Sequence, residues 1–268
     1  MASDTPLHFF DINSTLPGPS KSWSPNTLKT RIALNYKRIP YTQSWVSYPD
    51  IAPLLSSLAV PKSPTQTAYT LPAITHDSVT SNPTGTLMDS LAIAHHLEAT
   101  FPTPPLFPSG DASYALALAV HKLISIAFST ARPLILPPVA DFLDPRAQEY
   151  FVRTRSAAFG QPLADVRPRD PERVRALTAD TLKDLEIVVQ MLRGWEGKKS
   201  NGPFFEGETA GYADFIVVAF LAWAERADQE LWRAILGLGE GELERLWEAC
   251  LPWVNGQGEE KEWPIPQV

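Results

Sequence analysis

A proline-rich segment, FPTPPLFPSG at residues 101–110, separates two stretches of the 268-residue chain that differ in hydrophobic periodicity. Proline fixes φ and lacks an N–H group, so this segment can form neither a regular helix nor a central strand. Before it, short strand-like runs alternate with helical ones, whereas every pattern after it is helical. We therefore predict a mixed α/β domain at residues 1–101, a linker at 102–110 and an all-helical domain at 111–268.

The N-terminal stretch begins with a predicted β-α-β unit. LHFFDI, residues 7–12, alternates and is rich in aromatic residues, as strands are, and YTQSWVSY, residues 41–48, has the same character. Between them, apolar residues recur about every four positions over residues 28–39, which indicates a helix. Pro25 suits the first turn of this helix, because a proline there loses no hydrogen bond.

Further short elements precede the linker. DIAPLLSSLAV, residues 50–60, is a predicted short helix, and TLPAITH, residues 70–76, reads as a strand interrupted by a proline. SVT at residues 78–80 is its predicted hairpin partner. The last helix of the domain is expected to begin near Asp89 or Ser90.

Beyond the linker, YADFIVVAFLAWAERA, residues 212–227, is apolar on every side, which is typical of a helix at the centre of a bundle. Asp214, near its start, is predicted to be a structural capping residue rather than a catalytic one. Asp170 is the predicted N-cap of a long periodic helix that begins with Pro171.

Composition excludes several classes of function. The formal net charge is −7 with a sequence pI near 5.3, and no Lys/Arg run is present, so we expect no nucleic-acid partner. The longest strongly apolar run, residues 215–224, is about half the length of a bilayer span, and no signal-peptide pattern begins the chain. We expect a cytoplasmic protein with no membrane partner. A single cysteine, Cys250, excludes an internal disulfide, and the histidine spacing predicts no metal site.

Four motifs carry a family resemblance: SPNTLKTRIALNYKRIPY at residues 24–41, TLPAI at 70–74, DSLAIAHHLE at 89–98 and YADFIVVAFL at 212–221. In this order and spacing they resemble the first active-site helix, the cis-proline strand, the acidic-Ser motif and the buried helix of the cytosolic glutathione transferases. EYFVRTRSAAFGQPLADV, residues 149–166, is similar to the fungal class A type, which is related to the bacterial lignin β-etherases.

The resemblance implies a thioredoxin-like N-terminal domain and an all-helical C-terminal domain with a hydrophobic ligand site. It also implies glutathione as co-substrate and a homodimer. Ser24 is implied to donate its hydroxyl to the glutathione thiolate, with Asn26 as a further amide donor. From the pattern alone Ser24 is an ordinary helix N-cap, and Ser20 and Ser22 are rivals on the loop just before it.

The other implied contacts lie on the second and third motifs. A cis bond between Leu71 and Pro72 would present the backbone of Leu71 to the cysteinyl part of glutathione, as an added strand does. Ser90 would bind the γ-glutamyl carboxylate through its N–H and hydroxyl, and Asp89 would face the ammonium group. Asp89 departs from the Glu or Gln that the family usually has there. The partner of the glycine carboxylate is not identified by these motifs.

The implied activity is glutathione S-transfer to hydrophobic aromatic electrophiles, with peroxide reduction and the binding of plant or wood polyphenols beside it. Two alternatives stay open: a non-catalytic ligandin that carries phenolic metabolites, and a regulatory relative that binds other proteins. Glutathione affinity together with turnover separates the enzyme from both.

Overall fold

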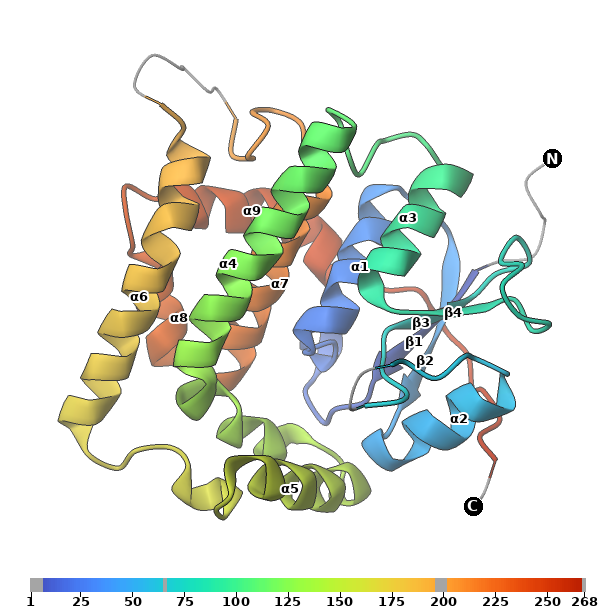
Figure 1. Cartoon of the computed structure of the whole chain (residues 1–268), viewed down its shortest axis with the longest axis horizontal. Helices are drawn as coiled ribbons and strands as arrows, with labels where there is room; N and C mark the ends of the chain where they lie inside the picture. Colours follow the sequence, from blue (N-terminus) through green and yellow to red (C-terminus); the bar gives the residue numbers. More distant parts are fainter. Residues whose placement is uncertain (1–6, 65–66, 196–201, 267–268) are drawn as a thin grey trace. The chain divides into compact units, whose positions relative to one another are not determined.

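The computed structural model of the protein describes residues 7–64, 67–195 and 202–266. By its internal contacts the chain divides into two compact units (Figure 1). Within the described ranges, the N-terminal unit contains the residues up to 105, residues 142–150 and the residues from 253 onwards, and the helical unit contains residues 106–141 and 151–252. The N-terminal unit thus includes two segments that follow the predicted linker in sequence. The predicted domain boundaries, at residues 101 and 111, stay a prediction.

A five-stranded mixed sheet forms the centre of the N-terminal unit, in the order β4-β3-β1-β2-β5. Parallel pairing joins β1 to β2, and antiparallel pairing joins β1 to β3 and β3 to β4. The predicted strands at residues 7–12 and 41–48 are confirmed. The strand bounds are β1 Leu7–Ile12, β2 Tyr41–Val46, β3 Ala73–Thr75, β4 Thr86–Met88 and β5 Glu259–Glu260.

The hairpin partner of β3 differs from the prediction. Residues 78–80 form no strand, and β4 pairs with β3 instead, with Ala73 opposite Met88. The loop of residues 76–85 joins the two strands, and His76 N–H donates to Gly85 O at 2.9 Å where it closes. Gly85 has a φ of +65°, which is unstrained because glycine has no Cβ. The strand that pairs with β3 therefore begins after Gly85, at Thr86, and not at residue 78.

Three helices alternate with these strands along the chain: α1 Pro25–Tyr36, α2 Ile51–Ser57 and α3 Ser90–Thr100. The predicted helix starts at Pro25 and next to Asp89 are confirmed. Short 3₁₀ turns precede α1 and α2, at residues 18–21 and 48–50. All eight residues from Thr27 to Leu34 are buried, so this part of α1 has no solvent-facing side.

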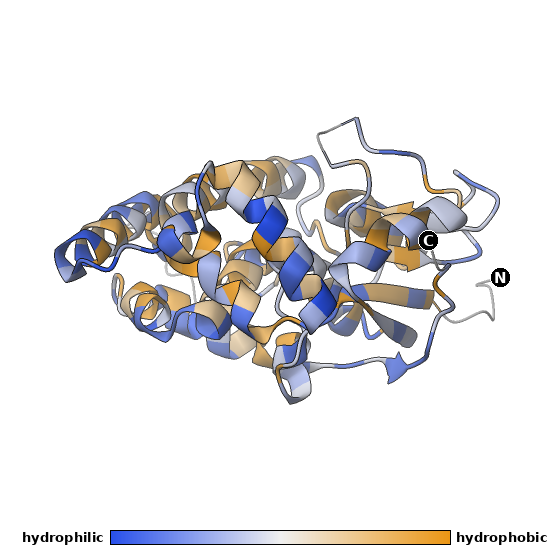
Figure 2. Ribbon diagram, turned by 90° about the horizontal axis from the view of Figure 1, so that it is seen from below, coloured by the Kyte–Doolittle hydropathy of each residue, from blue (hydrophilic) through white to orange (hydrophobic). Residues whose placement is uncertain are grey.

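The helical unit and the segment leading into it contain six long or medium helices within the described part of the chain: α4 Asp111–Ile135, α5 Pro145–Phe159, α6 Pro171–Arg193, α7 Tyr212–Ala227, α8 Gln229–Leu236 and α9 Glu242–Asn255. Every residue of α7 from Tyr212 to Ala224 is buried, as its all-round apolar sequence predicts. Most of the other helices carry hydrophobic and hydrophilic residues on different faces (Figure 2).

Two predicted caps are present in the helical unit. The Asp170 carboxylate accepts a hydrogen bond from Glu172 N–H at the start of α6. The Asp214 carboxylate accepts from Gly211 N–H at 2.8 Å and from Phe205 N–H at 3.0 Å. Burial outweighs these bonds and raises the pKa of Asp214 to about 7. Asp214 therefore joins the preceding loop to the start of α7.

By length and composition, α4 is the one helix among the described residues that could cross a membrane. It packs against α6 and α7 through a buried face that includes Ala117, Val120 and Ile124. The core helix of a globular protein passes the same test, so the match is weak evidence for a span.

The C-terminal tail extends the sheet of the N-terminal unit, which the sequence did not predict. β5 pairs in parallel with β2, placing Thr42 opposite Glu259. Trp45 Nε1–H donates to the Glu260 carboxylate at 2.7 Å, and the Trp263 ring contacts that of His8 at a centroid distance of 4.5 Å. The described residues from 253 to 266 therefore belong by packing to the N-terminal unit.

Candidate functional site

The sheet topology brings the predicted site residues to one edge. Ser24 precedes α1, which follows the carboxyl end of β1. Phe10, near that same end, pairs with Ala73, so Pro72 lies beside it, and Ala73 pairs in turn with Met88. The start of α1, the proline before β3 and the residues after β4 therefore share one edge of the sheet, which we call the site edge.

Ser24 is the N-cap residue of α1, with an extended backbone (φ −69°, ψ 127°). Its side chain makes no capping hydrogen bond within the described structure, although serine is favoured at this position because it forms one. Its residue exposure is 4%, which keeps the hydroxyl in a low-dielectric environment. The hydroxyl is thus left for another acceptor at a helix N-terminus, where negative charge is stabilised.

The rival Ser22 has a structural partner. Its hydroxyl donates to the Asp11 carboxylate at 2.6 Å and accepts from Arg31 Nε–H at 3.0 Å, and Ser22 is fully buried. A hydroxyl that already donates to a buried carboxylate cannot also donate to a thiolate. Ser20 lies in the 3₁₀ turn before α1, outside the helix N-terminus.

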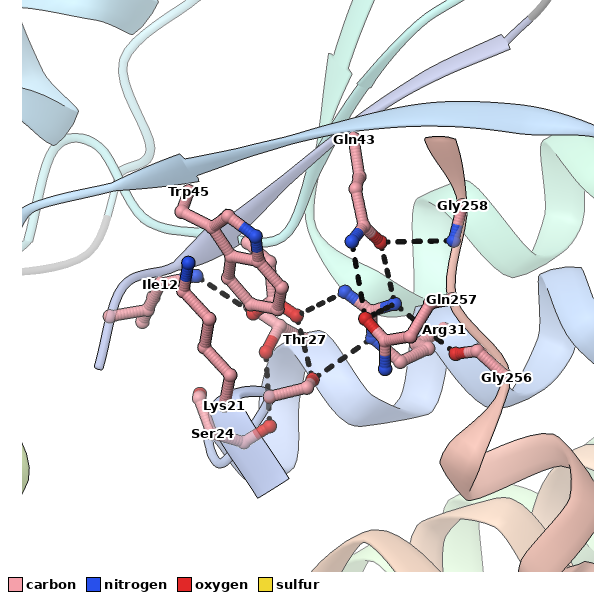
Figure 3. Close-up of polar contacts among 12 residues, drawn as sticks. Ile12, Lys21, Ser24, Thr27, Arg31, Gln43, Trp45, Gly256, Gln257 and Gly258 are labelled. Carbon is pink, nitrogen blue, oxygen red and sulfur yellow. Dashed lines mark hydrogen bonds and ion pairs between the residues drawn. The ribbon is translucent and has the colours of Figure 1, made fainter. Parts of the chain in front are cut away.

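These contacts belong to a buried polar network that we call the Arg31 cluster, shown in Figure 3. The Arg31 guanidinium pairs with Asp11 at 2.9 Å and donates to Gln43 Oε1 at 2.7 Å. It also donates to Gly256 O and Gln257 Oε1 of the C-terminal tail. Both side chains of the ion pair have 0% exposure, and the guanidinium has several acceptors around it.

The peptide bond between Leu71 and Pro72 is cis, as the family resemblance implies. Leu71 is buried, and Pro72 O accepts a hydrogen bond from Asp89 N–H at 3.3 Å. This bond joins the second and third motifs directly. The backbone before β3 is thereby fixed next to the start of α3.

Asp89 is the N-cap of α3 and has a φ of 85°, which is uncommon for a residue with a Cβ. Its carboxylate accepts from Leu91 N–H at 2.9 Å and from Ala92 N–H at 3.2 Å. Ser90 follows as the first helical residue and is buried. The start of α3 therefore combines a carboxylate with the partial positive charge of a helix N-terminus.

Two further residues of α1 complete the description of the site edge. Asn26 is exposed in the first turn of α1, two residues after Ser24. Lys29, one turn further, is buried, and burial lowers its pKa from 10.5 to about 8, while the Asp89 carboxylate opposes that shift. Sequence periodicity did not identify Lys29, because a lysine at this position is expected to face solvent.

Family models match both halves of the chain. Residues 23–100 match the glutathione S-transferase N-terminal domain, and residues 115–253 match the glutathione S-transferase C-terminal domain. The chain is 59% identical to a glutathione S-transferase-like protein of Aspergillus flavus, over 99% of this chain and 97% of that one. The chain belongs to the glutathione S-transferase family.

Solved structures agree with this assignment. A Ceriporiopsis subvermispora glutathione S-transferase in complex with glutathione is 30% identical, with a TM-score of 0.80 over 93% of this chain and 98% of that one. The fungal transferase GSTFuA3 of Phanerochaete chrysosporium is 29% identical, with a TM-score of 0.77 over 94% and 98%. The matches therefore assign a thioredoxin-like N-terminal domain and a helical C-terminal domain to this glutathione S-transferase family member, and its structural neighbours include fungal class A transferases.

Proposed function

We propose that this protein is an active serine-type glutathione S-transferase in which Ser24 stabilises the glutathione thiolate. A thiol has a pKa of about 8.5, so only a few per cent is ionised at neutral pH. The hydroxyl of Ser24 would donate to the sulfur, and the α1 N-terminus would add partial positive charge. The observation that carries the proposal is the buried Ser24 side chain, which leaves its usual capping bond unmade.

The other site-edge residues fix the tripeptide. The backbone of Leu71 would pair with the cysteinyl part, and Asp89 and Ser90 would hold the γ-glutamyl end. Asn26, exposed in the first turn of α1, would add an amide donor near the sulfur. Held in this way, the thiolate attacks an electrophilic carbon of an aromatic substrate and forms a thioether as the leaving group departs.

The same thiolate would reduce a peroxide by attacking its O–O bond, which gives a sulfenic acid and releases an alcohol. A second glutathione then converts the sulfenic acid to the disulfide and water. We extend the proposal to binding of aromatic polyphenols, a cytoplasmic location and a homodimer, all of which follow from the family resemblance.

The deciding experiment measures the pKa of the bound glutathione thiol by ultraviolet thiolate absorbance over a pH series, alongside turnover with a panel of aryl halides and hydroperoxides. In the wild-type protein we expect a thiol pKa well below 8.5. Ser24→Ala should move that pKa back towards 8.5 and lower turnover in parallel, whereas Ser57→Ala, on α2, serves as the matched serine control.

Unchanged turnover in Ser24→Ala would overturn the catalytic assignment. A wild-type protein that binds flavonoids but not glutathione would establish the ligandin in its place. Dimerisation is checked independently by light scattering.

A further inference from the structure

Lys29 is a largely buried cation without a structural partner among the described residues. Its exposure is 6%, and its ammonium group forms no hydrogen bond or ion pair with any residue that the structure describes. A buried charge is costly unless it is paired, so lysines in protein interiors normally have acceptors. Lys29 Nζ is not among the fully buried unpaired atoms of the described residues, so the ammonium reaches solvent and is accessible to an acceptor from outside the described fold.

Lys37, at the other end of the same helix, is the internal comparison. It is buried to the same degree, with 5% exposure. Its ammonium donates to Glu98 Oε2 at 2.8 Å, to Phe101 O at 2.6 Å and to Pro104 O at 2.7 Å. All three of its N–H bonds are therefore used, as those of a structural lysine should be.

The surroundings of Lys29 define the charge of its missing partner. Side chains on a helix lean towards the helix N-terminus, which for Lys29 is the site edge. The charged group that acts on it is the Asp89 carboxylate at the start of α3, a helix that packs against α1. Its Oδ1 atom accepts both capping bonds, from Leu91 and Ala92, which leaves Oδ2 for a further donor. A cation, a carboxylate and a helix N-terminus thus face one region.

We propose that the Lys29 ammonium binds the α-carboxylate of the γ-glutamyl residue of glutathione, beside Asp89, which takes the α-ammonium of the same residue. The γ-glutamyl head is a zwitterion, so a site with one cation and one anion matches it better than either charge alone. Lys29 thereby makes the site specific for ligands that carry both groups. This inference rests on the glutathione binding proposed above.

The test compares two proteins with two ligands by titration calorimetry at neutral pH. The proteins are the wild type and Lys29→Met, which keeps an apolar stem of similar length. The ligands are S-methylglutathione, which cannot react, and γ-aminobutyryl-S-methylcysteinylglycine, which lacks only the α-carboxylate. Lys62→Met, at an exposed position of the N-terminal unit, removes the same charge from the surface as a control.

We expect Lys29→Met to bind S-methylglutathione about 10- to 100-fold more weakly than the wild type, the loss typical of a charged hydrogen bond. For the ligand without the carboxylate the two proteins should have equal affinity. Lys62→Met should match the wild type with both ligands.

Equal weakening of both ligands by Lys29→Met would overturn the inference, because it would mean that the lysine acts through packing. Full affinity of Lys29→Met for S-methylglutathione would overturn it as well. The wild type also tests the contact without any substitution, since it should bind the carboxylate-free ligand at least about 10-fold more weakly than S-methylglutathione. A wild type that binds neither ligand would refute the proposed function itself.

Discussion

Arg31 and Lys29 lie two residues apart on α1 and are both buried, but their charges are compensated in different ways. The guanidinium of Arg31 has acceptors from β1, β2 and the C-terminal tail, all supplied by the chain. The ammonium of Lys29 has none among the described residues, and the hydroxyl of Ser24 on the same helix makes no capping bond. The polar groups of the Arg31 cluster are satisfied within the chain, whereas we propose that those of the site edge are satisfied by a ligand.

This contrast teaches that burial alone does not separate structural from functional polar groups. The two regions share a helix, a sheet and a low exposure to solvent. What differs is whether the polar atoms find partners within the chain. Substitutions in the Arg31 cluster should therefore change stability, and substitutions at the site edge should change ligand binding.

The largest effect is expected for Arg31→Met. Removing the guanidinium leaves the Asp11 carboxylate buried without its ion pair, which typically destabilises a protein by about 3–5 kcal/mol. Urea unfolding followed by circular dichroism measures the loss. Arg169→Met, which removes an exposed i,i+4 ion pair in the helical unit, should cost less than about 0.5 kcal/mol. If the two variants lost similar amounts of unfolding free energy, the Arg31 cluster would not be a structural network distinct from a surface ion pair.

Lys29→Met should change stability in the opposite direction. The folded-state pKa of Lys29 is about 8 and its unfolded value 10.5. At about 1.4 kcal/mol per pKa unit, burying the charge costs on the order of 3 kcal/mol below pH 8. The variant should therefore be more stable than the wild type at pH 7 without ligand.

The pH dependence supplies the check on Lys29. Between pH 8 and pH 10.5 the folded protein releases the Lys29 proton while the unfolded chain retains it, so wild-type stability rises through this window relative to the variant. The difference between the two free energies of unfolding should shrink accordingly in urea titrations across these pH values. A wild type more stable than Lys29→Met at pH 7 would show that Lys29 has a structural partner after all.

Ser24→Ala should lower transferase activity by about 10- to 100-fold, because a hydrogen bond to an anion contributes about 1.5–3 kcal/mol. Its effect on unfolding should be small, since the hydroxyl makes no capping bond that the substitution would remove. Steady-state kinetics with an aryl halide and urea unfolding on the same preparation test both halves. A large loss of stability with unchanged activity would assign Ser24 to the fold instead.

Ser22→Ala should lower stability and leave transferase activity unchanged, the reverse of Ser24→Ala. Its effect is the smallest of those predicted here. The substitution removes a donor from Asp11 and an acceptor from Arg31, both buried, at a cost of about 1–2 kcal/mol. The pKa of the bound glutathione thiol should not move. A shifted thiol pKa in Ser22→Ala, measured by thiolate absorbance, would reopen the choice between the two serines.

Local patterns predicted much of the fold. The strand-like runs predicted β1 and β2, and the helical period together with Pro25 predicted the start of α1. Such patterns can be read from the sequence because they depend only on neighbouring residues. The wholly apolar sequence of α7 gave its central position in the same way.

Features that depend on distant partners were not predicted. β5 consists of two glutamates, which are poor strand formers, and its pairing partner Thr42 is more than 200 residues away. Burial of Lys29 is likewise invisible to periodicity, since it depends on which distant elements pack around α1, and α3 is one of them. The motifs singled out Ser24 and Asp89 in the sequence. Only the structure shows which of their polar atoms form hydrogen bonds within the chain.

The C-terminal tail bears on the order in which the protein is made. The N-terminal unit takes the Gly256 and Gln257 acceptors of Arg31, and the strand beside β2, from the last residues of the chain. Domains generally fold in order as they leave the ribosome, the N-terminal one first. Here the N-terminal unit is completed only after residues 256–260 have been made, so the edge of β2 stays open during translation of the whole helical unit. Synthesis that stops short of residue 256 would therefore leave the first unit incomplete, although its own first hundred residues were present.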